Sequence, residues 1–311
     1  MNDNTSPKVI AFPEKEISTT DAFLRGCGSP LTQEAYAHVL AVVEAFLAKP
    51  VHQASRREIE SYVFHMKEQS ARPATIAQHL AALSSYTKFC LSEEIIAKDP
   101  MTSVRRPKVS DRSTRTGLTV DEMSKMIAAA DMSPTPLAVL RDKALITLLA
   151  LQGTRLAEAL NIHVESLRDE GGRKVAFVVR KGGKEGKLPL AAPTVAALAE
   201  WTSAAGISTG PIFVPVDKHG LVIPGKSISP SAAWKLVRRT AARAGLADIV
   251  HPHLFRHGAI TAALAGNVPL EKVQDFAGHA DPRTTRRYDA NRDSLNNPTA
   301  HILASIIKTR D

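Results

Sequence analysis

Apolar side chains in the first hundred residues recur at steps of three and four, the spacing that gathers them on one face of a helix. The pattern predicts helices that begin at Ser29 with Pro30, at Ser55, and at about Ala74. Ser55 is followed three residues later by Glu58, a pair that is typical of a capping box at a helix start. Together these segments predict a small all-helical bundle.

Three tyrosines lie on the apolar stripes of these helices: Tyr36, Tyr62 and Tyr86. A tyrosine that acts on phosphate needs cations beside it, and none of the three lies beside clustered arginines. The pattern therefore favours packing in the core of the bundle for all three.

From about residue 118 the pattern predicts longer helices. Thr119 and Glu122 have the spacing of a second capping box. A strongly apolar helix is expected over residues 137–151, and Gly153 ends it. A further helix from Ser231 carries basic residues on its polar side, and Trp201 and Trp234 lie on helical runs, where we expect both to anchor a core.

Two β-rich runs, residues 174–179 and 187–190, flank a glycine-rich basic turn and predict an antiparallel hairpin. The expected fold class is therefore mainly α with a small antiparallel β-sheet, as an N-terminal helical bundle followed by an α+β unit. The turn lacks the G-x-x-x-x-G-K-[ST] pattern, so a nucleotide-binding P-loop is not expected.

Residues 251–288 hold four histidines, four arginines and one tyrosine around two helical runs. His253, Arg256 and His257 are spaced by three and four residues, so one helix can aim all three side chains at one target. A second helix begins at Pro269 and ends at Gly278, directly before His279.

Asp281 and Pro282 then begin a third short helix, which brings Tyr288 among arginines. A tyrosine placed among arginines and histidines can attack a phosphodiester, because the cations neutralise the non-bridging oxygens while the phenol attacks phosphorus. Each residue alone is better read as an ordinary surface or core residue, and only the constellation favours this chemistry.

A chain of 311 residues is long enough for two domains. Lys and Arg number 40 against 31 Asp and Glu, a net charge of +9 that favours a nucleic-acid partner. The longest apolar run, residues 144–151, is too short to span a bilayer, so we expect a cytoplasmic, nucleoid-associated protein with no membrane partner. Cys27 and Cys90 are too few for a disulfide framework, and we expect both to be reduced.

The His253 and His257 spacing also suits a zinc pair. However, no Glu follows His253 as H-E-x-x-H requires, and no thiol or carboxylate cluster lies nearby in the sequence. We therefore expect neither a metal nor another cofactor.

The order of these residues resembles the tyrosine recombinase, or phage integrase, family. The resemblance rests on H-x-x-R-H at residues 253–257, on Gly278-His279, and on a tyrosine nine residues later. It also rests on Gly153-Thr154-Arg155 with Glu158 three residues on, and on K-G-x-K in the hairpin turn. The spacing predicts that Arg155 and Glu158 share one face of a helix, where Glu158 can hold the guanidinium by a charge-assisted bond.

The resemblance implies a role for each site residue. Tyr288 attacks the scissile phosphate to give a 3′-phosphotyrosyl bond and a free 5′-hydroxyl, and a second strand reverses the reaction. Arg155, Arg256 and His279 stabilise the pentacoordinate phosphorus, and His253 is the acid or base beside the nucleophile. Lys181 protonates the leaving 5′-oxygen, with Lys184 the less favoured candidate, while Glu158 and His257 support these groups. The expected DNA-binding residues are Arg105, Arg106, Lys108, Lys184, Lys235, Arg238, Arg239, Arg283, Arg286 and Arg287.

The domains expected on this basis are a mobile tail (1–19), a SAM-like core-binding domain (20–104), a basic linker (105–117) and a catalytic domain (118–311). The expected partner is double-stranded DNA with an inverted-repeat core site. A homotetramer on DNA is expected, linked in trans by an apolar terminal helix over residues 297–309, with accessory DNA-bending proteins possible by the same resemblance.

Two alternatives remain: a type IB topoisomerase-like enzyme that relaxes DNA, and a non-cleaving DNA-binding regulator on the same fold. The complete set of catalytic residue types argues against the regulator. The apolar terminal helix argues against the monomeric topoisomerase.

Overall fold

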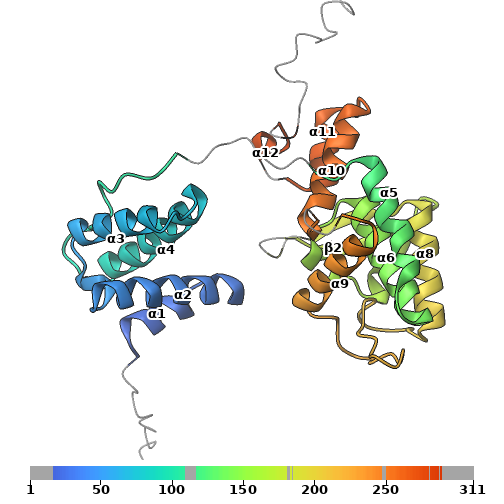
Figure 1. Cartoon of the computed structure of the whole chain (residues 1–311), viewed down its shortest axis with the longest axis horizontal. Coiled ribbons are helices and arrows are strands. Elements are labelled where there is room, and N and C mark those ends of the chain that lie inside the picture. Colours follow the sequence, from blue (N-terminus) through green and yellow to red (C-terminus); the bar gives the residue numbers. More distant parts are fainter. Residues whose placement is uncertain are drawn as a thin grey trace, which may run out of the picture. The chain divides into compact units, whose positions relative to one another are not determined.

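The computed structural model describes residues 17–108, 117–180, 183, 185–246, 250–279, 281–286 and 288. The chain divides into two compact units, Met1–Asp111 and Arg112–Asp311, each of which is described by itself (Figure 1). Among the described residues, every helix is too short or too polar to cross a lipid bilayer.

The first unit is a bundle of helices whose starts follow local capping chemistry. The side chain of Ser29 accepts a hydrogen bond from the backbone N–H of Thr32, and the predicted capping box of Ser55 and Glu58 is confirmed. Ala48, in the left-handed conformation, ends the second helix two residues before Pro50. The helices are α1 (Thr19–Arg25), α2 (Pro30–Leu47), α3 (Arg56–Glu68) and α4 (Pro73–Ser92), with a 3-10 turn η1 (Val51–Gln53).

The core of this bundle is aromatic. Phe23 lies at its centre, with its ring centroid 5.2 Å from that of Tyr86 and 5.9 Å from that of Tyr36. Tyr62 and Tyr86 are buried, and burial raises the pKa of both phenols. The predicted packing role is confirmed for these two, while Tyr36 is partly buried against the same cluster. Both cysteines are free thiols.

The second unit is built around one apolar helix, α6 (Pro136–Gln152), whose side chains are buried on almost every side. Helices α5 (Val120–Ala129), α8 (Ala192–Ala204) and α10 (Pro252–Ala265) pack against α6, as Figure 1 shows. Gly153, with φ of +54°, ends α6 as predicted. The other helices are α7 (Leu156–Leu160), α9 (Pro230–Arg243), α11 (Leu270–Ala277) and α12 (Pro282–Arg286), with 3-10 turns η2 (Ala130–Met132) and η3 (Val164–Ser166).

A three-stranded antiparallel sheet has the order β1-β2-β3, with β1 (Leu167–Glu170), β2 (Arg173–Val179) and β3 (Glu185–Pro189). The predicted hairpin corresponds to β2 and β3, in which Val179 pairs with Glu185. The edge strand β1 was not predicted, because its sequence Leu-Arg-Asp-Glu has no apolar alternation. The expected fold class, mainly α with a small antiparallel sheet, is confirmed.

The prediction that both tryptophans anchor a core is wrong for Trp234, which lies on α9. Trp201 is fully buried and its indole N–H donates to the carbonyl of Ile212 at 2.8 Å, whereas Trp234 is 46% exposed. Trp234 is not a core anchor, because Leu236 and Val237 occupy the buried face of α9 and its ring lies against the guanidinium of Arg238, 5.6 Å away. The helix also begins earlier than the predicted Ser231: its first residue is Pro230 and Ser229 caps it.

Candidate active site

Arg155 stands at the end of the turn that follows α6. It is the N-cap of α7, one residue before the helix in which we expected it. Its Nη1 donates to Oε1 of Glu158 at 2.6 Å, and its backbone N–H donates to Oε2 at 3.1 Å. The predicted charge-assisted contact is confirmed, and because Glu158 is buried it holds the guanidinium in one orientation.

Arg256 is almost completely buried at the first turns of α10. Its Nη1 donates to the carbonyl of Gly153 at 2.9 Å, and its Nη2 donates to the carbonyl of Ala277. Burial, followed by the charge of Arg155, lowers the pKa of Arg256 to about 10, so the side chain is still cationic at neutral pH. Two backbone carbonyls, one at the C-terminal end of α6 and one at the C-terminal end of α11, therefore hold this guanidinium in place.

His253 and His257 occupy successive turns of α10, with ring centroids 4.8 Å apart. The phenol oxygen of Tyr288 lies 3.3 Å from Nε2 of His257, and their rings meet edge to face at 4.6 Å. Although solvent reaches His253, partial burial and the neighbouring charges of His257 and Arg256 lower its pKa to about 4. Burial also lowers the pKa of His257, so both imidazoles are neutral near pH 7.

The ring of His279 stacks on that of Tyr288, with ring centroids 5.9 Å apart and an interplanar angle of 18°. This histidine directly follows Gly278, which ends α11 in the left-handed conformation, as predicted. Its Nδ1 lies 2.9 Å from the hydroxyl of Thr285 on α12. Burial, followed by the charge of Arg256, lowers the pKa of His279 to about 4. When the Thr285 hydroxyl donates to Nδ1, the proton of the neutral ring lies on Nε2, free to donate to an oxyanion.

The short helix α12 has the predicted cap. The carboxylate of Asp281 accepts a hydrogen bond from the backbone N–H of Arg283 at 2.9 Å, with Pro282 at the first helical position. Arg283 forms an ion pair with Asp281 on the surface, and Arg286 is also exposed.

Several predicted residues lie outside the described residues: Lys181, Lys184, Arg287 and the terminal segment 297–309. The neighbouring Arg180 is described, and sequence reasoning missed it. Its charge acts on Arg256, which places its guanidinium near the site. Strand alternation could have found it, because Arg180 directly follows β2 and is two residues after the buried Val178, the spacing that separates residues on one face of a strand.

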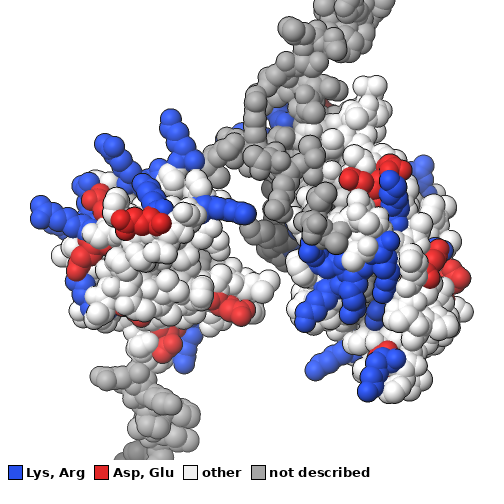
Figure 2. All heavy atoms as spheres, in the orientation of Figure 1, with Lys and Arg blue, Asp and Glu red and all other residues white. Residues whose placement is uncertain are grey.

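The predicted DNA-binding residues fall into separate groups. Arg105, Arg106 and Lys108 are exposed at the end of the first unit, and Arg106 donates to the hydroxyl of Ser84 at 2.7 Å. Figure 2 shows Lys and Arg gathered on one face of the second unit, over α9. Helix α9 carries four basic residues, Lys235, Arg238, Arg239 and Arg243.

Within the described ranges, no group of three His, Cys, Asp or Glu side chains could hold a metal ion. Arg155 and Arg256 are fixed donors for an anion, the neutral imidazoles can accept or donate a proton, and the ring of Tyr288 contacts both His257 and His279. This combination suits nucleophilic attack on a phosphodiester.

Two family models match the chain. Residues 117–294 match the phage integrase family, and residues 21–97 match the N-terminal SAM-like domain of phage integrases. The tyrosine recombinase XerC of Alcanivorax borkumensis is 30% identical over 264 residues, which are 84% of this chain and 83% of that protein. XerD of Bifidobacterium longum is 28% identical over 240 residues, 75% of this chain and 77% of its own.

Solved structures share the fold. A XerH recombinase bound to its difH substrate matches with a TM-score of 0.63 and 20% identity over 89% of this chain and 79% of that chain. A lambda integrase dimer bound to a COC′ core site matches with a TM-score of 0.67 and 17% identity, over 89% of this chain and 77% of that chain. From its domain matches and its XerC relative, the chain belongs to the phage integrase family of tyrosine recombinases.

Proposed function

We propose that this protein is a site-specific DNA recombinase that cleaves and rejoins strands through a 3′-phosphotyrosyl intermediate at Tyr288. The observation that carries the proposal is the position of Tyr288, whose ring contacts the imidazoles of His257 and His279 and which lies close enough to Arg256 to affect the pKa of that guanidinium. Similarity to XerC and XerD supports strand exchange over simple relaxation or regulation.

In this mechanism the phenol oxygen of Tyr288 attacks phosphorus and the bond to the 5′-oxygen breaks. Arg155 and Arg256 neutralise the non-bridging oxygens, and their orientation is set in advance by Glu158 and by two backbone carbonyls. His279 donates a hydrogen bond from Nε2, and an imidazole of α10 accepts the phenol proton. The 5′-hydroxyl of a second strand then displaces the tyrosine, so bond energy is conserved.

The leaving 5′-oxygen needs a proton, and we assign its donor to Lys181 in the turn between β2 and β3. When sulfur replaces the bridging 5′-oxygen of the duplex, the cleaved strand leaves as a thiolate. Its thiol has a low pKa, so this leaving group needs no proton. Lys181→Ala should therefore recover most of its cleavage rate on the sulfur duplex, whereas Arg256→Ala should not. Recovery of Lys184→Ala in place of Lys181→Ala would move the assignment by three residues.

The main test is capture of the covalent intermediate. The protein's core site is first selected from random duplexes by binding, and a nicked suicide duplex that carries the site is then incubated with protein. The wild type should become attached to a 3′-phosphate, and Tyr288→Phe should not. Tyr36→Phe, in the first unit, is the matched control and should react normally. An adduct with Tyr288→Phe would remove Tyr288 from the role of nucleophile.

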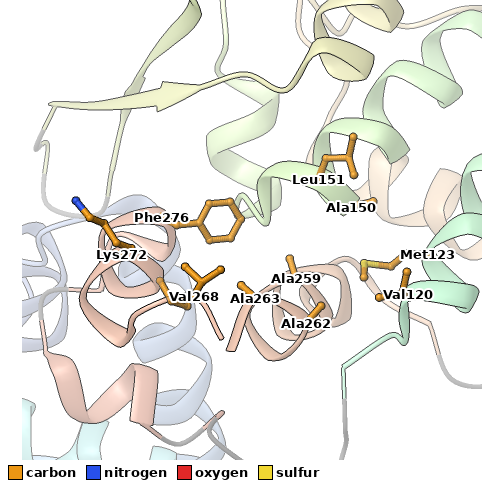
Figure 3. A pocket seen from close by; sticks show the side chains of 11 residues that line it. Val120, Met123, Ala150, Leu151, Ala259, Ala262, Ala263, Val268, Lys272 and Phe276 are labelled. Atoms are coloured by element: carbon orange, nitrogen blue, oxygen red, sulfur yellow. The ribbon is translucent and has the colours of Figure 1, made fainter. Parts of the chain in front are cut away.

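We further propose that the protein acts on an inverted-repeat core site as a homotetramer. An apolar cavity of about 410 Å³ in the second unit supports this arrangement (Figure 3). Helices α5, α6, α10 and α11 line it, and Val120, Leu151, Ala262 and Phe276 are among the lining residues. Residues 297–309 hold an apolar stripe of four aliphatic side chains, Ile302, Leu303, Ile306 and Ile307. We assign this cavity to the terminal segment of a second copy.

Two variants test that assignment. Deletion from Asn297 onward should spare binding to a single site and abolish synapsis of two sites. Ala262→Trp, which fills the cavity, should have the same effect, while Ala199→Trp on the exposed side of α8 should not. Recombination at the normal rate by the truncated protein would show that the segment is not needed in trans.

A further inference from the structure

Arg180 follows the last residue of β2 at the entrance of the hairpin turn. Its backbone carbonyl accepts a hydrogen bond from Gly183, which closes the turn. Its side chain is half-buried, and it makes no hydrogen bond or ion pair with any residue in the described part of the chain. A guanidinium has five donors and keeps its charge, so an unpaired and partly desolvated one is costly.

Two glycines make room for this side chain. A Cβ on Gly186 of β3 would lie 2.6 Å from Nε of Arg180, and a Cβ on Gly278 would overlap Nη1. Gly278 is also the left-handed residue that ends α11, directly before His279. The guanidinium therefore fits in a slot between the hairpin and the turn that carries His279.

The slot faces other positive charges. The charge of Arg180 acts on Arg256 together with that of Arg155, so three guanidiniums converge on one region. Lys187 and Lys272 line the adjoining hollow of about 340 Å³ with Arg180. Asp275 also lines this hollow, yet no ion pair joins it to Arg180 among the described residues. Glu158 is bonded to Arg155, so an excess of positive charge faces the site, and an anion from outside the chain would balance it.

We propose that Arg180 is a third guanidinium for the scissile phosphate, beside Arg155 and Arg256. This inference rests on the proposed function, because the anion that it names is the phosphodiester that Tyr288 attacks. Nη1 and Nη2 of Arg256 already donate to the carbonyls of Gly153 and Ala277. By contrast, no described residue accepts a hydrogen bond from the guanidinium of Arg180. Arg180 stabilises the charge that grows on a non-bridging oxygen as the pentacoordinate phosphorus forms.

The test separates charge from packing. Arg180→Met fills the same slot without a charge, and Arg180→Lys keeps the charge without the planar fork. Each variant is compared with wild type on a suicide duplex with an ordinary scissile phosphate and on one whose scissile phosphate is a methylphosphonate, which has no negative charge. The matched control is Arg173→Met, at the exposed opposite end of β2.

On the ordinary duplex, Arg180→Met should slow adduct formation by roughly 10²- to 10³-fold, the usual cost of one donor to a developing oxyanion. Arg180→Lys should form the adduct at an intermediate rate, and Arg173→Met should form it at nearly the wild-type rate. On the methylphosphonate duplex the difference between Arg180→Met and wild type should largely disappear. A normal rate for Arg180→Met, or the same defect on both duplexes, would overturn the inference. Adduct formation by the wild type on the ordinary duplex tests the proposed function separately.

Discussion

The phenol oxygen of Tyr288 lies 3.3 Å from Nε2 of His257, although these residues are 31 positions apart in the chain. The resemblance to tyrosine recombinases assigned proton transfer near the nucleophile to His253 and a supporting role to His257. In the structure His257 contacts the phenol oxygen and can accept its proton. The lowered pKa of His257 keeps the acceptor nitrogen unprotonated at neutral pH.

Replacement of His257 should therefore affect the chemical step. His257→Gln should slow adduct formation by roughly 10²-fold or more, the lower end of the range for general base catalysis, without weakening DNA binding. His219→Gln, at an exposed turn, is the control. Single-turnover cleavage and a binding titration measure the two effects. An unchanged rate would leave His257 with a packing role only.

The pKa values of His253 and His279, both about 4, predict a pH dependence of stability. Between pH 4 and pH 6.5 the unfolded chain binds protons at these histidines and the folded chain does not, so stability falls as pH is lowered through this window. The thermal midpoint of His279→Gln should fall less steeply than that of wild type between pH 7 and pH 4.5. If the two plots of thermal midpoint against pH are parallel, His279 does not contribute to the pH dependence of stability.

Gly258 marks a close backbone crossing. A Cβ at this position of α10 would overlap the carbonyl oxygen of Leu118 and lie 3.0 Å from its nitrogen, which itself donates to the carbonyl of Leu254. Gly258→Ala should displace α10, at a cost of about 1–3 kcal/mol, and slow cleavage because α10 carries Arg256 and His257. Thermal unfolding measures the first effect. Gly28→Ala, with nothing within 4 Å of its added carbon, should change neither.

The basic face of α9 should bind the DNA backbone. The double variant Lys235→Ala, Arg239→Ala should reduce the slope of log affinity against log salt by roughly 0.9 for each phosphate that the variant no longer neutralises. Fluorescence anisotropy between about 50 and 200 mM salt measures this slope. Lys125→Ala, which removes a surface cation paired with Asp121, is the control. An unchanged slope would remove α9 from the DNA-binding surface.

Local sequence was sufficient to predict the features that depend on neighbours a few positions away. The capping boxes at Ser55 and Thr119, the left-handed end of α6 at Gly153 and the Arg155–Glu158 contact all involve groups within four residues of each other. Their partners are therefore visible in the local pattern. The order of histidines, arginines and tyrosine also indicated the family, because the chemistry requires those residue types.

Which of those side chains meet depends on the packing of distant segments. The carbonyl of Gly153 orients Arg256 from 103 positions away, and Gly278 and Gly186 together make room for Arg180. The exposure of Trp234 and the addition of β1 to the sheet also depend on what covers each face. Periodicity predicts that a face is apolar or polar, but it does not specify which neighbour covers that face, because contacts between distant segments leave no repeating pattern in the sequence.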